Sequence, residues 1–174
     1  MLNMMKKKSV RCCCALILAA LLILADRLSK LAAARCLKDA EPVTVIPRLL
    51  SLTYVENTGA AFGLFSGGAA VLFVFTAVLL VIITVLYLRL LDTDYRMPRV
   101  LLVFVFAGGC GNMIDRFFMG YVVDMIWFRP FNFPVFNLAD CYITVSAFLL
   151  IILLLTKYRD EDFGQTAGRK KSDG

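Results

Sequence analysis

The chain has 174 residues, a formal net charge of +6, a hydrophobic fraction of 60% and a mean hydropathy of +0.79. A soluble protein of this size cannot bury so much apolar surface in one core, so we expect lipid to be its solvent. The sequence contains no histidine, which excludes Ser-His-Asp and Cys-His catalysis and every zinc site that needs imidazole.

Four apolar segments are long enough to cross a membrane, which takes about 20 mainly apolar residues. They predict a mainly α, polytopic membrane protein with four transmembrane helices, at about residues 11–32, 67–89, 99–119 and 138–157. The basic start and short apolar middle of the first segment also fit a cleavable signal peptide, but its apolar pattern continues through residues 26–34 without a turn signal. We therefore expect a retained helix, one membrane domain over residues 1–160, and a polar, disordered cytoplasmic tail at 161–174.

Basic residues predict the orientation of the four segments. They gather before the first segment, between the second and third, and after the fourth, at 6–11, 89–99 and 157–171. By the positive-inside rule both termini are then cytoplasmic, and the loops at about 35–66 and 119–137 face outward. Because these residues flank apolar runs and form no single stripe, we expect no nucleic-acid partner.

The two outward loops contain strand-like sequence. Residues 43–65 and the segment "GYVVDMIWF" (120–128) are rich in β-branched and aromatic residues, which favours a small extracytoplasmic β element. In "ENTGAAFG" (56–63) two glycines permit a turn or a close approach of the backbone.

The six cysteines show no CxxC spacing. Cys12, Cys13 and Cys14 begin the first apolar run, and Cys110 and Cys141 lie in or beside two others. We interpret them as small apolar packing residues, and we expect neither a metal site nor a cofactor.

Charged residues in three of the helices lie at one depth. At 1.5 Å per residue, Asp26 lies about 21 Å above the inner end of its segment, Asp115 lies about 22 Å above the start of its own, and Asp140 lies about 3 Å below the outer start of the fourth. Lys30 follows Asp26 by four residues, the spacing of a salt bridge on one helix face. An ion within the membrane costs roughly 2.5–3.5 kcal/mol, so this convergence predicts paired or functional charges.

Two acids frame the second outward loop, and each has a structural alternative. Asn137 and Asp140 have the spacing of a helix cap, and Asp124 fits a solvated loop acid. An enclosed pair of carboxylates is equally a means of separating two pKa values for catalysis. Arg116 cannot lose its proton, so it needs an anion, which is either Asp115, a catalytic carboxylate or a substrate.

Four blocks of this sequence resemble the signature blocks of one known family. "DRLSK" (26–30), "ENTGAAFG" (56–63), "GGCGNMIDRFFMGYVVDMI" (108–126) and "FNLADCYI" (136–143) occur in the order and spacing found in lipoprotein signal peptidases. These are the signal peptidases II, a family of bacterial membrane aspartyl proteases. The blocks span nearly all of residues 10–158.

The resemblance implies a function and a set of site residues. It implies an intramembrane aspartyl endopeptidase of the bacterial cytoplasmic (inner) membrane, active on its extracytoplasmic side, which cuts diacylglyceryl-modified prolipoproteins on the amino side of the lipidated cysteine. It implies membrane lipid as a partner and globomycin as an inhibitor. The implied catalytic pair is Asp124 and Asp140, and Asp115 is implied to be structural. The implied substrate-binding or supporting residues are Asp26, Lys30, Asn57, Gly59, Asn112, Arg116 and Asn137.

Two other classes of protein fit the residues alone. In a small proton- or ion-coupled transporter subunit, acids within the membrane relay protons or cations. No internal repeat of the transporter kind is visible in the sequence. In a non-enzymatic membrane adaptor, Asp124 and Asp140 would each be replaceable without loss of function.

Overall fold

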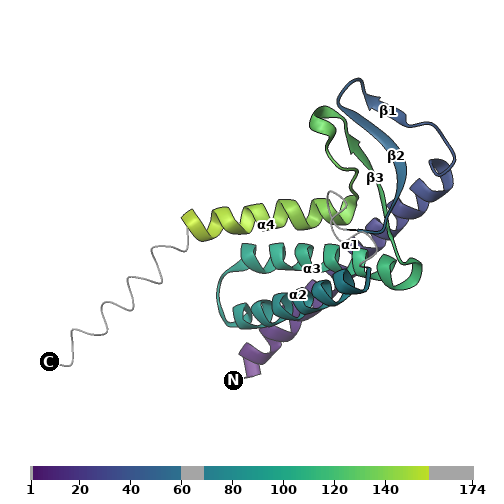
Figure 1. Cartoon of the computed structure of the whole chain (residues 1–174). Coiled ribbons are helices and arrows are strands. Elements are labelled where there is room, and N and C mark those ends of the chain that lie inside the picture. Colours follow the sequence, from purple (N-terminus) through teal and green to yellow (C-terminus); the bar gives the residue numbers. More distant parts are fainter. Residues whose placement is uncertain (1, 60–68, 157–174) are drawn as a thin grey trace.

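The computed structural model describes residues 2–59 and 69–156. Four helices in this part of the chain are long and apolar enough to cross a membrane. They are α1 (Leu2–Cys36), α2 (Ala69–Arg89), α3 (Arg96–Met119) and α4 (Leu138–Thr156). A three-stranded sheet lies at one end of the bundle (Figure 1). The predicted fold class is therefore confirmed, and the predicted tail at 161–174 lies outside the described residues.

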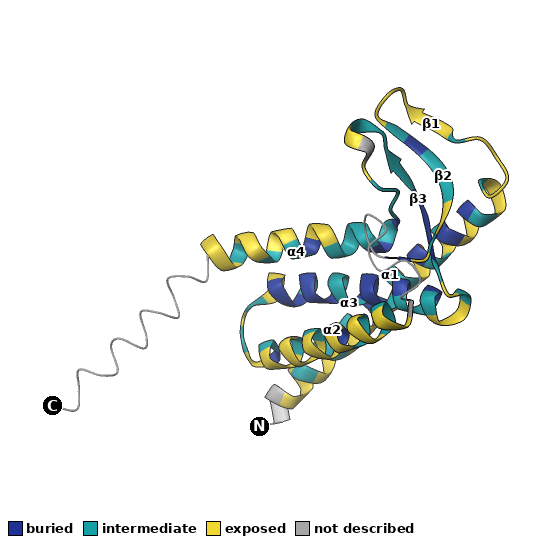
Figure 2. Ribbon diagram, viewed as in Figure 1, coloured by how far each residue is buried: buried dark blue, intermediate teal, exposed yellow. Residues whose placement is uncertain are grey.

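Helix α3 is the centre of the bundle. It packs against α1, α2 and α4, and it is the most continuously buried helix in Figure 2. The other three helices turn many large apolar side chains outward, for example Leu16, Phe75 and Leu155. Such surfaces are stable in lipid and would aggregate in water.

Local sequence signals explain where the helices begin and end. Helix α3 tolerates Pro98 in its first turn, where a missing N–H breaks no helical hydrogen bond. It ends at Gly120, which adopts a left-handed conformation with a φ of 78° and donates its N–H to the carbonyl oxygen of Arg116 at 3.1 Å. Helix α1 runs unbroken through the segment that also fitted a signal peptide. One face of its second half, with Asp26, Lys30 and Ala33, is buried against the rest of the protein.

The sheet brings together the two loops that were predicted to face outward. Its strands are β1 (Val43–Ile46), β2 (Leu50–Asn57) and β3 (Val122–Phe128), all antiparallel in the order β1-β2-β3. Asp124 lies opposite Val55, and the register shifts between Leu52 and Val55. The segment before α4 extends this pairing, because Ile126 and Phe136 exchange backbone hydrogen bonds of 2.8 and 3.0 Å.

Two short 3₁₀ helices complete the described elements. One, η2 (Leu90–Asp92), follows α2, and the other, η3 (Pro130–Asn132), lies between β3 and α4.

The interpretation of the cysteines as packing residues is wrong for Cys13, Cys14 and Cys36, which are exposed. Near Cys13 and Cys14, the face of α1 that packs against the bundle carries Ala15 and Ala19 instead.

Candidate active site

A cavity of about 400 Å³ opens where the sheet meets the bundle. Its walls come from β2, α3, β3, α4 and the loop that precedes α4. Six of the residues that the sequence singled out line it together, namely Asn57, Gly59, Asn112, Arg116, Asp124 and Asp140. The rest of the wall is mainly apolar and includes residues 133–136. The cavity is thus an apolar pocket with converging polar groups, the usual form of a ligand site.

Asp124 projects into this cavity from the buried half of β3 and is only 2% exposed. Its Oδ2 accepts a hydrogen bond of 2.8 Å from Asn57 Nδ2, and its Oδ1 accepts one of 2.6 Å from Asn137 Nδ2. Burial of the carboxyl group raises the pKa of Asp124 to about 6, although both hydrogen bonds favour the ionised form. The carboxyl group can therefore exchange a proton close to neutral pH.

Asp140 lies in the first turn of α4 and serves as a helix cap. Its Oδ2 accepts a hydrogen bond of 3.1 Å from the backbone N–H of Asn137, and its own N–H donates to Asn137 Oδ1 at 3.0 Å. This is the reciprocal pattern of a capping box, which confirms the cap predicted from spacing. The second oxygen, Oδ1, accepts a hydrogen bond of 2.8 Å from Asn112 Nδ2 and lines the same cavity as Asp124.

Asn137 links the two aspartates and is completely buried. Its amide nitrogen donates to Asp124 and also to Asn112 Oδ1, at 3.2 Å. Its amide oxygen and backbone N–H form the capping box with Asp140. One residue therefore holds both carboxyl groups, that of Asp124 through its side-chain amide and that of Asp140 through its backbone N–H.

A buried ionic network supports the cavity from inside the bundle. Lys30 Nζ lies 2.8 Å from Asp26 Oδ2, 2.8 Å from Asp115 Oδ2 and 2.9 Å from Asn112 Oδ1. The contact with Asn112 is a hydrogen bond, and the contacts with the two carboxylates are ion pairs. The Asp26–Lys30 salt bridge predicted from spacing is confirmed. Asp26 also accepts a hydrogen bond of 3.0 Å from the backbone N–H of Ala139, so α1 caps α4.

Asp115 belongs to this network and does not line the cavity. Its Oδ1 contacts Arg27, and its Oδ2 contacts Lys30. Arg116 does line the cavity, where it donates a hydrogen bond of 3.4 Å to the carbonyl oxygen of Gly59. Among the described residues Arg116 makes no ion pair, so neither Asp115 nor either carboxylate of the cavity, Asp124 or Asp140, is its direct partner.

Sequence reasoning missed two features of the network. Arg27 is the partner of Asp115, and the signal available for it was a charge beside Asp26 within an apolar segment. Gly111 allows α3 to approach α1, because a Cβ at this position would lie 2.6 Å from Asp26 Oδ2. No spacing rule indicates this second contact.

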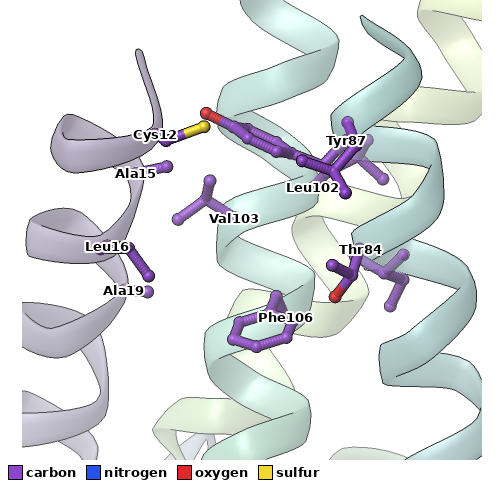
Figure 3. A pocket seen from close by; sticks show the side chains of 11 residues that line it. Cys12, Ala15, Leu16, Ala19, Thr84, Tyr87, Leu102, Val103 and Phe106 are labelled. Atoms are coloured by element: carbon purple, nitrogen blue, oxygen red, sulfur yellow. The ribbon is translucent and has the colours of Figure 1, made fainter. Parts of the chain in front are cut away.

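A second cavity, of about 270 Å³, lies between α1, α2 and α3, toward the end of the bundle that is farther from the sheet (Figure 3). Apolar side chains line it, together with the Cys12 thiol and the hydroxyls of Thr84 and Tyr87. It contains no carboxylate, so it lacks the groups for acid–base chemistry. Within the described residues, no cluster of three or more acidic or cysteine side chains is arranged to hold a metal ion.

The fold and the site define a multi-pass membrane protein in which two carboxyl groups line one mainly apolar cavity. Residues 18–156 match the family model for signal peptidase (SPase) II. Proteins named lipoprotein signal peptidase match at 36% identity over 143 residues in Clostridium tetani (80% of this chain, 91% of that protein) and at 35% over 137 residues in Staphylococcus aureus (77% and 83%).

Solved structures agree with the sequence matches. A bacterial membrane enzyme solved at 2.3 Å superposes with a TM-score of 0.75 at 31% identity, covering 84% of this chain and 90% of that one. Another, solved at 1.9 Å, gives 0.71 at 32% identity, with 82% and 93% covered. The chain belongs to the signal peptidase II family. It is therefore a peptidase, which decides against the transporter and adaptor alternatives.

Proposed function

We propose that this chain is an aspartyl endopeptidase that removes signal peptides from lipoprotein precursors. It acts on precursors carrying diacylglycerol on a cysteine, and it cuts on the amino side of that cysteine. Family membership supports the substrate class, because the relatives are lipoprotein signal peptidases. The observation that carries the proposal of an aspartyl mechanism is that Asp124 and Asp140 line one cavity and are both bound by Asn137.

The chemistry follows from two neighbouring carboxyl groups. Both cannot ionise cheaply, so near neutral pH the pair holds one proton. The ionised member takes a proton from a water molecule as its oxygen attacks the scissile carbonyl carbon. The protonated member donates a hydrogen bond to the developing oxyanion. As the C–N bond breaks, the leaving amine takes its proton from the pair. We assign the two roles to the pair jointly.

The other site residues hold these two acids and the substrate. Asn57, Asn112 and Asn137 orient the carboxyl groups through the hydrogen bonds described above. Arg116 and Gly59 present donor groups and backbone at the cavity wall, where an extended peptide needs partners for its carbonyl groups. Asp26, Lys30 and Asp115 act beneath them as structural support, within one domain spanning residues 1–160.

The position of the cavity suits a lipid-bearing substrate. It lies beside the sheet end of the bundle, so acyl chains stay in the membrane while the peptide bond reaches water. With the predicted orientation, this end faces the extracytoplasmic side of the bacterial cytoplasmic membrane. Membrane lipid then surrounds the helices, and globomycin is the expected inhibitor.

Cleavage of a diacylglyceryl-modified precursor by the purified protein in vesicles tests the proposal, with product followed by gel shift. Asp124→Asn and Asp140→Asn should each lower turnover by at least about 10²-fold, the range typical of lost acid–base catalysis. Asp39→Asn, which changes an exposed acid just after α1, is the matched control and should leave turnover unchanged. Near-normal turnover in either site variant refutes the aspartyl pair.

A further inference from the structure

A third cavity, of about 390 Å³, lies at the end of the bundle away from the aspartates. It is formed mainly between α1 and α3. Three arginines line it, namely Arg11, Arg96 and Arg99, and Tyr87 adds a hydroxyl group. The remaining wall is apolar and includes Leu18 and Val103. A basic end and an apolar wall thus share one cavity.

The positive charge in this cavity is poorly balanced. Arg99 is only 8% exposed, yet within the described residues neither Arg99 nor Arg96 makes an ion pair. Arg11 lies 3.9 Å from a carboxylate oxygen of Asp94, whose side chain is fully exposed. Buried cations normally carry a paired anion, because the desolvation of an unpaired charge is costly. Arg99 therefore lacks the anion that its burial calls for, and two further arginines lie beside it in the cavity.

Arg11 and Arg99 donate hydrogen bonds with a structural role, and these bonds do not use all of their guanidinium N–H groups. Arg99 Nη1 donates to the carbonyl oxygens of Leu90 and Thr93, at 2.9 and 2.6 Å. Arg11 Nη1 likewise contacts carbonyl groups of the turn after α2. Arg11 and Arg99 thus each use one guanidinium nitrogen, Nη1, to cap this turn. The remaining N–H groups are of the kind that bind phosphate oxygens through two parallel bonds.

We propose that this cavity binds the phosphate of an anionic phospholipid. The three guanidinium groups take the phosphate oxygens. The glycerol and the adjoining part of an acyl chain lie along the apolar wall of α1 and α3. A lipid fits better than a soluble phosphate because much of the cavity wall is apolar and continues into the lipid-facing surface of the bundle. Basic residues beside a membrane helix attract anionic headgroups by about 1 kcal/mol each, which corresponds to about a fivefold change in affinity.

Lipid titration of the full-length protein in a zwitterionic detergent tests this proposal. The probes are phosphatidylglycerol, phosphatidylcholine with the same acyl chains, and inorganic phosphate. Native mass spectrometry counts the lipids retained, and the midpoint of thermal unfolding follows binding. We expect one phosphatidylglycerol to bind at least about tenfold more tightly than phosphatidylcholine.

The decisive variant is Arg96→Ala, because Arg96 is exposed and its loss should not prevent folding. It should weaken phosphatidylglycerol binding about fivefold. Arg89→Ala is the matched control, since it removes an exposed arginine at the same end but outside the cavity, and it should change binding less than about twofold.

Three results would overturn the proposal. Equal binding of the two phospholipids removes the phosphate preference. Equal effects of the Arg96 and Arg89 variants show attraction by general surface charge alone. Displacement of phosphatidylglycerol by a comparable concentration of inorganic phosphate shows a site for a free anion. Cleavage activity enters none of these measurements, so the proposal stands or falls separately from the proposed function.

Discussion

Replacement of Gly111 by alanine tests how tightly α3 must approach the buried network. The added Cβ would lie 2.6 Å from Asp26 Oδ2 and 3.3 Å from its Cγ. Asp26 cannot move aside freely, because Oδ1 accepts the N–H of Ala139 at 3.0 Å and Oδ2 lies 2.8 Å from Lys30 Nζ. The alanine must therefore displace a carboxylate that is held on both oxygens, or push the helices apart.

The size of the effect follows from three contributions. Overpacking a tightly packed site costs about 1–3 kcal/mol. Weakening the cap that Asp26 gives to α4 adds about 1 kcal/mol. The better helix propensity of alanine offsets about 1 kcal/mol. We expect a net loss of about 1–3 kcal/mol in the free energy of unfolding. Cleavage should also fall by about 10²-fold, because the displaced first turn of α4 contains Asp140.

Reversible unfolding in detergent measures this change, with Gly109→Ala on the same helix as the matched control. A Cβ at Gly109 would lie 2.9 Å from Leu80 Cδ2, the end of a flexible side chain, so that variant should be nearly as stable as the wild type. In an Asp26→Ala background the clash is absent, and Gly111→Ala should then cost little more. Equal stability of the Gly109 and Gly111 variants would refute the reasoning.

Three further predictions concern the site. Because burial raises the folded-state pKa of Asp124 from 3.8 to about 6, its contribution to stability is full below about pH 4 and is lost as the pH rises through about 6. The loss amounts to about 3 kcal/mol. Unfolding measured from pH 4 to 8 should show this slope in the wild type, and the same slope in Asp124→Asn would contradict it. Lys30→Met leaves two buried carboxylates without their shared cation and should destabilise the fold by about 3–5 kcal/mol. Lys7→Met, at an exposed position, should change stability by less than about 0.5 kcal/mol, and similar values for the two lysines would count against the network. Asn137→Ala should lower stability by about 1 kcal/mol through the lost cap, and Asn137→Ser should restore stability but not cleavage, because serine caps a helix but has no amide to hold Asp124. Recovery of cleavage in the serine variant would show that Asn137 acts only as a cap.

Interactions between residues close in sequence were predictable. Asp26 and Lys30 are one helical turn apart, and Asn137 and Asp140 are three residues apart, so helix geometry alone brings each pair together. The four helices were predicted from hydropathy. The similar depth of the charged residues in three of them was predicted from the fixed rise per residue of a helix. In each case the geometry of a single helix was sufficient to make the prediction.

Contacts between distant elements were not predictable from the same rules. Arg27 and Asp115 are 88 residues apart, and their contact depends on how α1 and α3 rotate and tilt against each other. The hydrogen bond from Asn57 to Asp124 depends on strand register and on the irregularity between Leu52 and Val55. Shape complementarity between elements decides these contacts, and a single sequence does not encode it in any simple spacing.

The backbone pairing of Ile126 with Phe136 has a mechanical consequence. It closes the chain between the two aspartates into a short loop, with Asp124 two residues before one end and Asp140 four residues after the other. The hydrogen-bonded backbone at the base of this loop therefore holds the two carboxyl groups at a fixed distance from each other. An opening that admits a lipidated peptide has to come from other elements, such as the β1–β2 hairpin. Such an opening can be wide without disturbing the spacing on which catalysis depends.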